Sequence, residues 1–169
     1  MRFDTVFLIA LTGAGAALAD LVPAQPPNNN FGGTQSGIGS WFRANNAQDH
    51  TNGKSWCGFA YYDTDPVFAP SLKAMGGATW NSNPTQWEQD TAAWCGLEAE
   101  VTDPTTGNSM KMYIGDAFDE TYVRTPGSID IMVDAFSTLH GNPNGNKDDV
   151  IQGVQWKLTG NRNTYYAAQ

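Results

Sequence analysis

Short apolar runs, each closed by glycine, proline, asparagine or aspartate, recur along most of this 169-residue sequence. Short runs between turn residues are typical of the strands of an all-β barrel or sandwich. We therefore expect an all-β fold, with strands at residues 37–42, 57–63, 97–102, 110–115, 128–131 and 150–158.

The clearest local structure is a hairpin within residues 97–115. Apolar residues alternate with other residues along both arms, and the connecting segment DPTTGN supplies proline and glycine for the turn. Alternation places one set of side chains on one face of the hairpin. We expect that face to be buried, with Leu97, Ala99, Val101, Met110, Met112 and Ile114 on it.

Helical spacing replaces alternation after Ile131. Apolar residues there recur every three or four positions, and Gly141 stands where a helix C-cap is expected. A second short helix is expected at residues 70–75, ended by two glycines. Residues 76–94 are interpreted as a long insertion, mostly loop, with a helical turn at PTQWEQD. The helix expected after Ile131 would carry the apolar residues Met132, Val133, Phe136 and Leu139.

The N-terminal segment, residues 1–19, has the apolar run and small-residue ending of a secretory signal peptide cut before Asp20. An N-terminal membrane anchor is the alternative, but the apolar stretch is shorter than the roughly 20 residues that a spanning helix needs. We expect a flexible, Pro-, Asn- and Gly-rich leader at 20–36, one folded domain at 37–160 and a C-terminal tail at 161–169. The protein is expected to be secreted and extracellular, with no membrane partner.

The charge balance argues against a nucleic-acid partner. The formal net charge is -8 and the pI is about 4.4. Proteins that bind phosphate backbones carry basic patches, which release counterions on binding. The acidity mainly favours solubility.

Two cysteines, Cys57 and Cys95, both precede a glycine. In a secreted chain they are most simply one disulfide, worth about 3–4 kcal/mol in the chain-entropy model. A catalytic thiol is the alternative, but it needs a neighbouring base, and His50 and His140 lie in polar loops. These histidines also lack a paired ligand at metal-binding spacing, so no metal site and no cofactor are expected.

Several short motifs follow one another in an order that resembles a known family. GIGSWF opens the series, WCGFAYY and WCGLEAEV follow, and then come Asp116 in YIGDAF, Asp130 in SIDIMVDAF and Trp156 in GVQWKL. This order resembles the double-psi β-barrel domains of the expansin, loosenin and barwin group and of rare-lipoprotein-A-like proteins. The resemblance covers residues 37–158, and it implies a six-stranded double-psi β-barrel with one or two short helices.

The resemblance gives Asp130 and Asp116 a role. In the resembling proteins the aspartate at the position of Asp130 lies on the barrel's groove and meets polysaccharide, and it is the general acid in related endoglucanases and lytic transglycosylases. Asp116 and Asp130 would then share one groove. Apolar neighbours such as Ile129 and Ile131 would raise the pKa of Asp130 and favour its proton-donating form. The alternative is a helix N-cap, since aspartates just before a helix often accept its first backbone N–H groups.

The residues around the groove depart from the hydrolase pattern. Inverting hydrolysis needs a second carboxylate that activates water. In the related endoglucanases this base closely follows the opening strand, whereas SWFRANNAQ has no acid before Asp49. The base is therefore missing, as in expansins, which are thought to loosen polysaccharides without cutting them. A hydrolase would still be possible if Asp49, Asp63 or Asp119 folded into the groove.

Hydroxyl and aromatic residues are the expected glycan contacts, because aromatic rings stack on the C–H faces of sugars. The alternative for each aromatic residue is a place in the core, and Trp156 is assigned to the core because it alternates with Val154 and Leu158. In the opening strand, Phe42 replaces the family's tyrosine, so the phenolic hydroxyl is lost. The expected substrate-binding residues are Ser40, Trp41, Tyr61, Tyr62 and Tyr122.

Together these observations predict a monomeric, secreted, expansin-like protein that binds and loosens cell-wall polysaccharide, cellulose or chitin, without hydrolysis. Because the chain ends at Gln169, we expect no second binding domain and weak binding. A secreted protease inhibitor or host-directed effector on the same barrel is an alternative, with the insertion at 76–94 and the loop GNPNGNKDD as contact surfaces. A glycoside hydrolase of the barrel-type endoglucanase class is the other.

Overall fold

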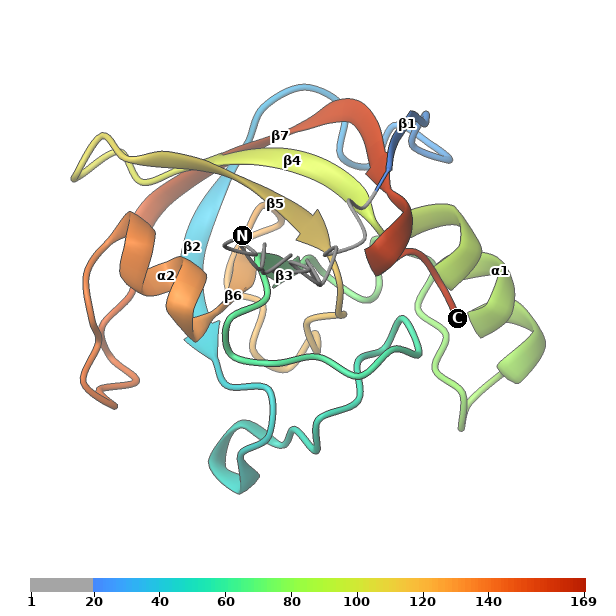
Figure 1. Ribbon diagram of the computed structural model, residues 1–169, viewed down its shortest axis with the longest axis horizontal. Helices are drawn as coiled ribbons and strands as arrows, with labels where there is room; N and C mark the ends of the chain where they lie inside the picture. The colour runs from blue at the N-terminus through green and yellow to red at the C-terminus, as the bar shows by residue number, and fades with distance from the viewer. Residues whose placement is uncertain (1–19) are drawn as a thin grey trace, which may run out of the picture.

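Six strands close into a mixed β-barrel in the computed structural model, which describes residues 20–169 (Figure 1). The predicted signal peptide lies outside the described residues. The barrel strands are β2 (Gln35–Phe42), β3 (Val67–Ala69), β4 (Leu97–Thr102), β5 (Ser109–Ile114), β6 (Ile129–Met132) and β7 (Ile151–Asn163). The barrel closes because β7 pairs with both β2 and β4. The β2–β6 and β3–β5 pairs are parallel, and the other four barrel pairs are antiparallel. The predicted fold, an all-β six-stranded double-psi barrel with short helices, is confirmed.

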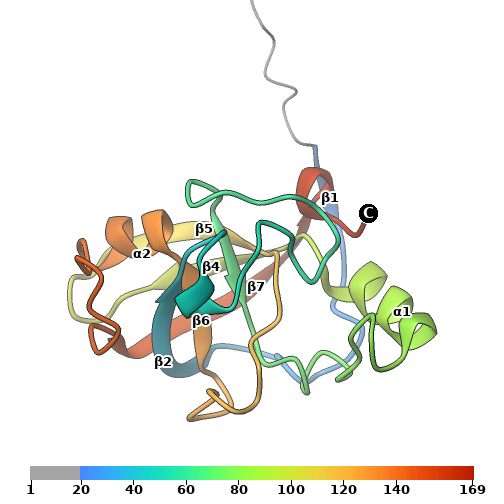
Figure 2. The same ribbon diagram turned by 90° about the horizontal axis from the view of Figure 1, so that it is seen from below.

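Two α-helices flank the barrel on opposite sides, α1 (Pro84–Trp94) and α2 (Val133–Leu139) (Figure 2). The expected helix after Ile131 is α2, and the turn expected in the insertion is the longer helix α1. Asn83 caps α1 by accepting a hydrogen bond from the Gln86 N–H, and Pro84 occupies the first turn. Short 3-10 helices lie at Ala47–Asp49 and Thr164–Tyr166. Residues 70–75 form turns, so the helix predicted there is wrong.

One of the predicted strands does not form. Residues 57–63 make a single bridge, between Ala60 and Lys54, because Cys57 is tied into a turn by its disulfide. Strand β3 was not predicted, since its three residues are too short to show alternation. Its partners are β5 and β6, both distant in the sequence.

Both ends of the described chain are anchored, in contrast to the leader and tail expected there. The first strand, β1 (Leu21–Pro23), pairs with β7, and Phe31 is buried against the rings of Trp94 and Trp156. At the other end, β7 extends to Asn163, and Tyr166 packs into a second cluster around the disulfide. The polar composition of residues 20–36 predicted a flexible segment and gave no sign that its one aromatic residue, Phe31, would be buried.

The main core fills the barrel interior, and it contains the predicted face of the hairpin. Five of its six side chains are buried, and Met110 is half-buried. Trp156 is fully buried between Phe31 and Phe68, and its indole N–H donates to the Gly127 carbonyl at 2.9 Å. The assignment of Trp156 to the core is confirmed.

Two backbones cross closely where β2 passes the residues before β6. A methyl group on Gly37 would collide with the backbone of Gly127 and Ser128. We therefore expect Gly37→Ala to lower the free energy of unfolding by about 1–3 kcal/mol, the usual cost of overpacking. Urea unfolding measures this, with Ser36→Ala on the exposed neighbouring position as the control. An unchanged midpoint for Gly37→Ala would contradict the crossing.

Candidate functional site

A groove of about 1350 Å³ is lined by residues of the barrel and of the insertion at 76–94. A smaller cavity of about 500 Å³ adjoins it, because six residues line both. Asp130 is one of them, so this carboxyl lies where the groove and the cavity meet. The other shared residues are Phe42, Asp49, His50, Phe118 and Tyr122.

Asp130 is held in the middle of β6 by strands on both sides. It lies opposite Ser40 in the parallel strand β2 and opposite Ala69 in the antiparallel strand β3. The Ser40 hydroxyl donates a hydrogen bond to Asp130 Oδ1 at 2.8 Å. Helix α2 begins after Met132, which makes no side-chain cap, so Asp130 is a groove residue and not the helix cap.

Burial raises the pKa of Asp130 to about 7. The nearby carboxylates of Asp49 and Asp116 act in the same direction, while the Ser40 hydrogen bond and the Lys147 ammonium oppose the rise. Asp130 therefore carries a proton in much of the population at neutral pH, and it can either donate or accept a hydrogen bond.

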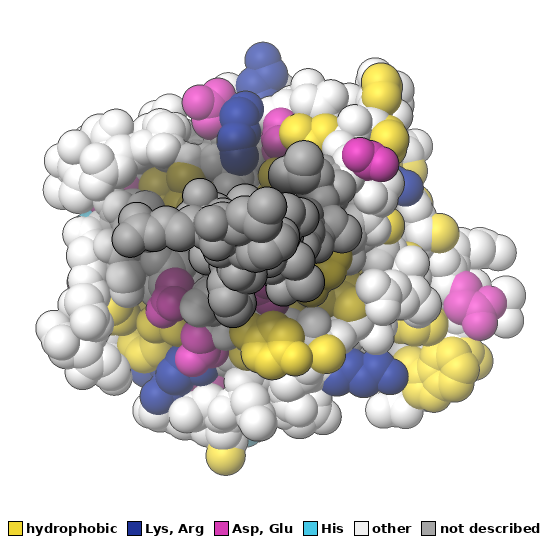
Figure 3. Space-filling view, viewed as in Figure 1, with side chains coloured by type: hydrophobic (Ala, Val, Ile, Leu, Met, Phe, Trp, Pro, Cys, Tyr) yellow, Lys and Arg dark blue, Asp and Glu magenta, His cyan; other side chains and the backbone are white. Residues whose placement is uncertain are grey.

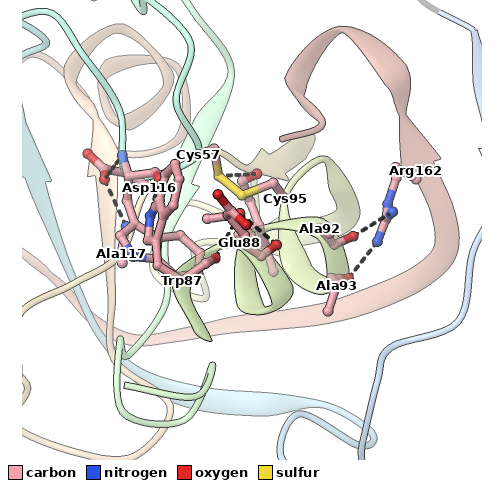
Figure 4. Close-up of a disulfide and its surroundings, with 12 residues drawn as sticks. Cys57, Trp87, Glu88, Ala92, Ala93, Cys95, Asp116, Ala117 and Arg162 are labelled. Carbon is pink, nitrogen blue, oxygen red and sulfur yellow. Dashed lines mark hydrogen bonds between the residues drawn. A yellow bond between two sulfur atoms is a disulfide. The ribbon is translucent and has the colours of Figure 1, made fainter. Parts of the chain in front are cut away.

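Asp116 lines the same groove just after β5, where three donors hold it. The backbone N–H groups of Trp56 and Ala117 donate to Oδ1, and the Tyr61 hydroxyl donates to Oδ2, each at 2.9 Å (Figure 4 draws the two backbone bonds). Burial raises the pKa of Asp116 against the opposing effect of these hydrogen bonds. Burial, together with the charge of Asp116, also raises the pKa of Tyr61, so this phenol remains a donor.

The smaller cavity contains a second charged cluster, centred on Asp49. Arg43 Nε and Lys147 Nζ each lie 2.7 Å from its carboxylate, whose side chain is only 2% exposed. Burial alone would raise the pKa of Asp49, but its hydrogen bonds to Arg43 and Lys147 hold this pKa below its ordinary value. Lys147 Nζ also lies 3.5 Å from the centre of the Trp41 ring.

The predicted glycan contacts fall into three groups. Ser40, Tyr61 and Tyr122 line the groove or the cavity, and Tyr122 is exposed. Trp41 lines the cavity but is buried, and Lys147 covers its ring, so its placement does not support stacking. Tyr62 is exposed but lies outside both linings.

The predicted disulfide between Cys57 and Cys95 is present. It joins the segment after Trp56 to the C-terminal end of α1, close to Asp116 (Figure 4). At the far side of this helix, the Arg162 guanidinium donates to the carbonyls of Ala92 and Ala93. The helix is thus fixed to the barrel at its C-terminal end.

Sequence reasoning missed four aromatic side chains of the groove: Trp56, Trp80, Trp87 and Phe118. Three of them are tryptophans on or beside the insertion, whose place could not be derived from local patterns. Of the three acids considered as a possible base, Asp49 and Asp119 line the groove. Asp63 is outside its lining and accepts a hydrogen bond from the Ala44 N–H.

Asp119 is exposed, unlike Asp49, Asp116 and Asp130 in the same groove. The backbone N–H of Thr121 donates to its carboxylate and lowers its pKa. Asp119 is therefore an ionised carboxylate at neutral pH.

Among residues 20–169, no three His, Cys, Asp or Glu side chains gather in a way that could hold a metal ion. Over the same residues, no helix has both the length and the apolar character to cross a bilayer.

No protein-family model matches the chain, and no curated protein sequence matches it. Among solved structures, the chain is similar to an expansin of Clavibacter michiganensis. A mutant of that expansin in complex with cellohexaose is 17% identical with a TM-score of 0.48, and the match covers 75% of this chain and 50% of that one. The apo form is 18% identical with a TM-score of 0.47 and the same coverage. The chain thus spans half the length of the expansin that it matches.

Proposed function

We propose that this protein binds a cell-wall polysaccharide, cellulose or chitin, in the groove and loosens its packing without cutting it. The observation that carries the proposal is the position of Asp130. Its carboxyl lies where the groove and the adjoining cavity meet, beside the hydroxyl of Ser40.

The chemistry of the lining suits a sugar polymer. A sugar ring offers hydroxyl groups at its rim and apolar C–H groups on its faces, so it needs both polar groups and aromatic surface. The groove supplies the carboxyls of Asp130 and Asp116 and the exposed ring of Tyr122. At a net charge of -8, a neutral glycan is also a better partner than a phosphate polymer.

The state of the other acids supports binding without hydrolysis. An inverting hydrolase pairs a protonated acid with an ionised base that is free to activate water. Asp130 has the raised pKa of an acid, but Asp49 is neutralised by Arg43 and Lys147. Asp116 is occupied by three donors, and its own pKa is raised.

Asp119 is the observation that favours a second candidate function. It is exposed, its pKa is lowered, and it lines the same groove as Asp130. A glycoside hydrolase in which Asp130 is the acid and Asp119 the base is therefore the alternative to be tested.

A pull-down of the protein on insoluble cellulose, chitin and peptidoglycan tests the proposal. We expect binding to cellulose or chitin, and we expect Asp130→Ala to weaken it about tenfold, because a buried polar group that loses its hydrogen-bond partner costs about 1–3 kcal/mol. Asp134→Asn, which removes an exposed acid in the first turn of α2, is the matched control.

Reducing ends measured in the same samples separate the two functions. No released sugar supports the non-hydrolytic groove, whereas release that Asp119→Asn abolishes would establish the hydrolase. If the unchanged protein binds none of the three polymers, the groove proposal is wrong, and an inhibitor or effector acting through its loops takes its place. Secretion, a monomeric state and the absence of a nucleic-acid partner belong to the same proposal, and the disulfide is compatible with an oxidising compartment.

A further inference from the structure

The insertion at residues 76–94 adds an exposed tryptophan to the groove wall. Trp80 is 60% exposed and lines the groove. Its ring meets the ring of Trp87 at 5.3 Å and 86°, an edge-to-face contact. In the space-filling view, hydrophobic side chains gather at the margin of the molecule in the region of α1 (Figure 3).

Hydrogen bonds fix Trp87, one member of this tryptophan pair, to the candidate site. The Trp87 indole N–H donates to the Trp56 carbonyl, and the Trp56 indole N–H donates to the Ala78 carbonyl, both at 2.9 Å. The backbone N–H of Trp56 is itself a donor to Asp116. Trp87 lies on the same side of the disulfide as Asp116 (Figure 4). Trp87, against which the Trp80 ring packs, is therefore held in place relative to Asp116, so part of the cost of ordering the Trp80 ring is met before a ligand binds.

The surroundings of Trp80 indicate what it could bind. A single exposed aromatic side chain is common on a protein surface, so what marks Trp80 is its place in the groove lining, against the ring of Trp87. Polar side chains line the groove beside it, namely Asn52, Thr79, Asn81 and Glu88. An apolar ring face with hydrogen-bonding groups next to it is complementary to a pyranose ring, which has C–H faces and a hydroxyl rim.

We propose that Trp80 is an aromatic subsite that stacks on a pyranose ring of the glycan chain whose neighbouring part contacts Asp130. This inference rests on the proposed function and adds to it the class of ligand that the groove prefers. The ligand is a neutral oligosaccharide long enough to reach from Asp130 to the insertion. Longer chains should therefore bind more tightly than short ones.

Titrations with cello- and chito-oligosaccharides of two to six units test the subsite. We expect the affinity of the unchanged protein to rise with length. Trp80→Ala should lower the affinity for the longest oligosaccharide about 3- to 10-fold, the range expected for one aromatic stack, and leave the shortest unaffected. Tyr62→Ala is the matched control, because Tyr62 is exposed to a similar degree but lies outside the groove. In protein labelled at tryptophan nitrogen, the Trp80 indole signal should shift with the longest ligand alone.

Each outcome separates this inference from the proposed function. If the affinity of Trp80→Ala still rises with oligosaccharide length as in the unchanged protein, while Asp130→Ala loses binding, the subsite is wrong and the proposed function stands. If the unchanged protein binds oligosaccharides without any gain with length, the subsite is again wrong. If it binds neither oligosaccharides nor insoluble polymer, both are wrong. Equal melting temperatures for Trp80→Ala and the unchanged protein exclude misfolding as the cause of a loss.

Discussion

Replacing Asp130 with asparagine should raise the free energy of unfolding at pH 7, by an amount on the order of a few kcal/mol. Asparagine has nearly the same shape, can still accept the hydrogen bond of Ser40, and carries no charge to be buried. The gain should shrink as the pH falls toward 4 and vanish below about pH 3, where the aspartate is protonated in the unfolded chain as well.

The sign follows from the raised pKa. The pKa of Asp130 is about 7 in the fold and 3.8 in its ordinary state, so between these values the folded protein holds a proton that the unfolded chain has lost. Stability therefore falls as the pH rises from about 4 to about 7. Asp116, whose pKa is also raised, acts in the same direction. The carboxyls with lowered pKa values, Asp49, Asp103 and Asp119, contribute stability that is lost only as the pH falls below about 4.

Urea unfolding at pH 4.5, 5.5 and 7 measures this dependence. The unchanged protein should lose stability across the series, and Asp130→Asn should lose markedly less. Asp134→Asn removes the same charge from an exposed position in α2, and it should keep the slope of the unchanged protein. Equal slopes for Asp130→Asn and the unchanged protein would contradict the raised pKa of Asp130.

Loss of the disulfide is the second large effect. A double variant, Cys57→Ala with Cys95→Ala, should lower the free energy of unfolding by about 3–4 kcal/mol, because the bridge closes a loop with a sequence separation of 38 residues. Both cysteines are fully buried in the second cluster, beside Phe59 and Tyr166, so part of the loss would be packing.

The comparison that isolates the cross-link is the unchanged protein with and without a reductant. Urea unfolding in dithiothreitol should reproduce most of the loss seen in the double variant. The difference between the two values gives the contribution of the missing sulfur atoms. Equal midpoints for the oxidised and reduced protein would contradict a stabilising role of the bridge.

Local patterns in the sequence predicted the hairpin β4–β5 and the β6–α2 unit, because alternation and helical spacing are properties of neighbouring residues. They did not predict β3, whose three residues belong to the barrel only through β5 and β6. Helix α1 was underestimated because its sequence, PTQWEQDTAAW, has few apolar residues. The usable signals there were Asn83 as a cap and Pro84 in the first turn.

The residues of the candidate site also fall into those that the sequence predicted and those that it did not. Asp130 and Asp116 were predicted from motif order, which carries information about groups far apart in the chain. Lys147 was not, although it lies on the Trp41 ring from 106 residues away, because nothing local marks a lysine in a polar loop. The tryptophans of the insertion also escaped prediction, since their place depends on a helix and a disulfide that had first to be located.

The pairing of Ser40 with Asp130 has a consequence for how the chain folds. The two residues are 90 positions apart and meet through a parallel pair of strands, which no hairpin can form. Chains dominated by such non-local pairings fold in milliseconds to seconds, because loop closure precedes the contacts that reward it. During synthesis, β2 must wait unpaired until β6 and β7 have been made. The groove therefore forms only when the barrel closes. A barrel that has not yet closed exposes strand edges and lacks the paired Ser40 and Asp130 that we assign to binding.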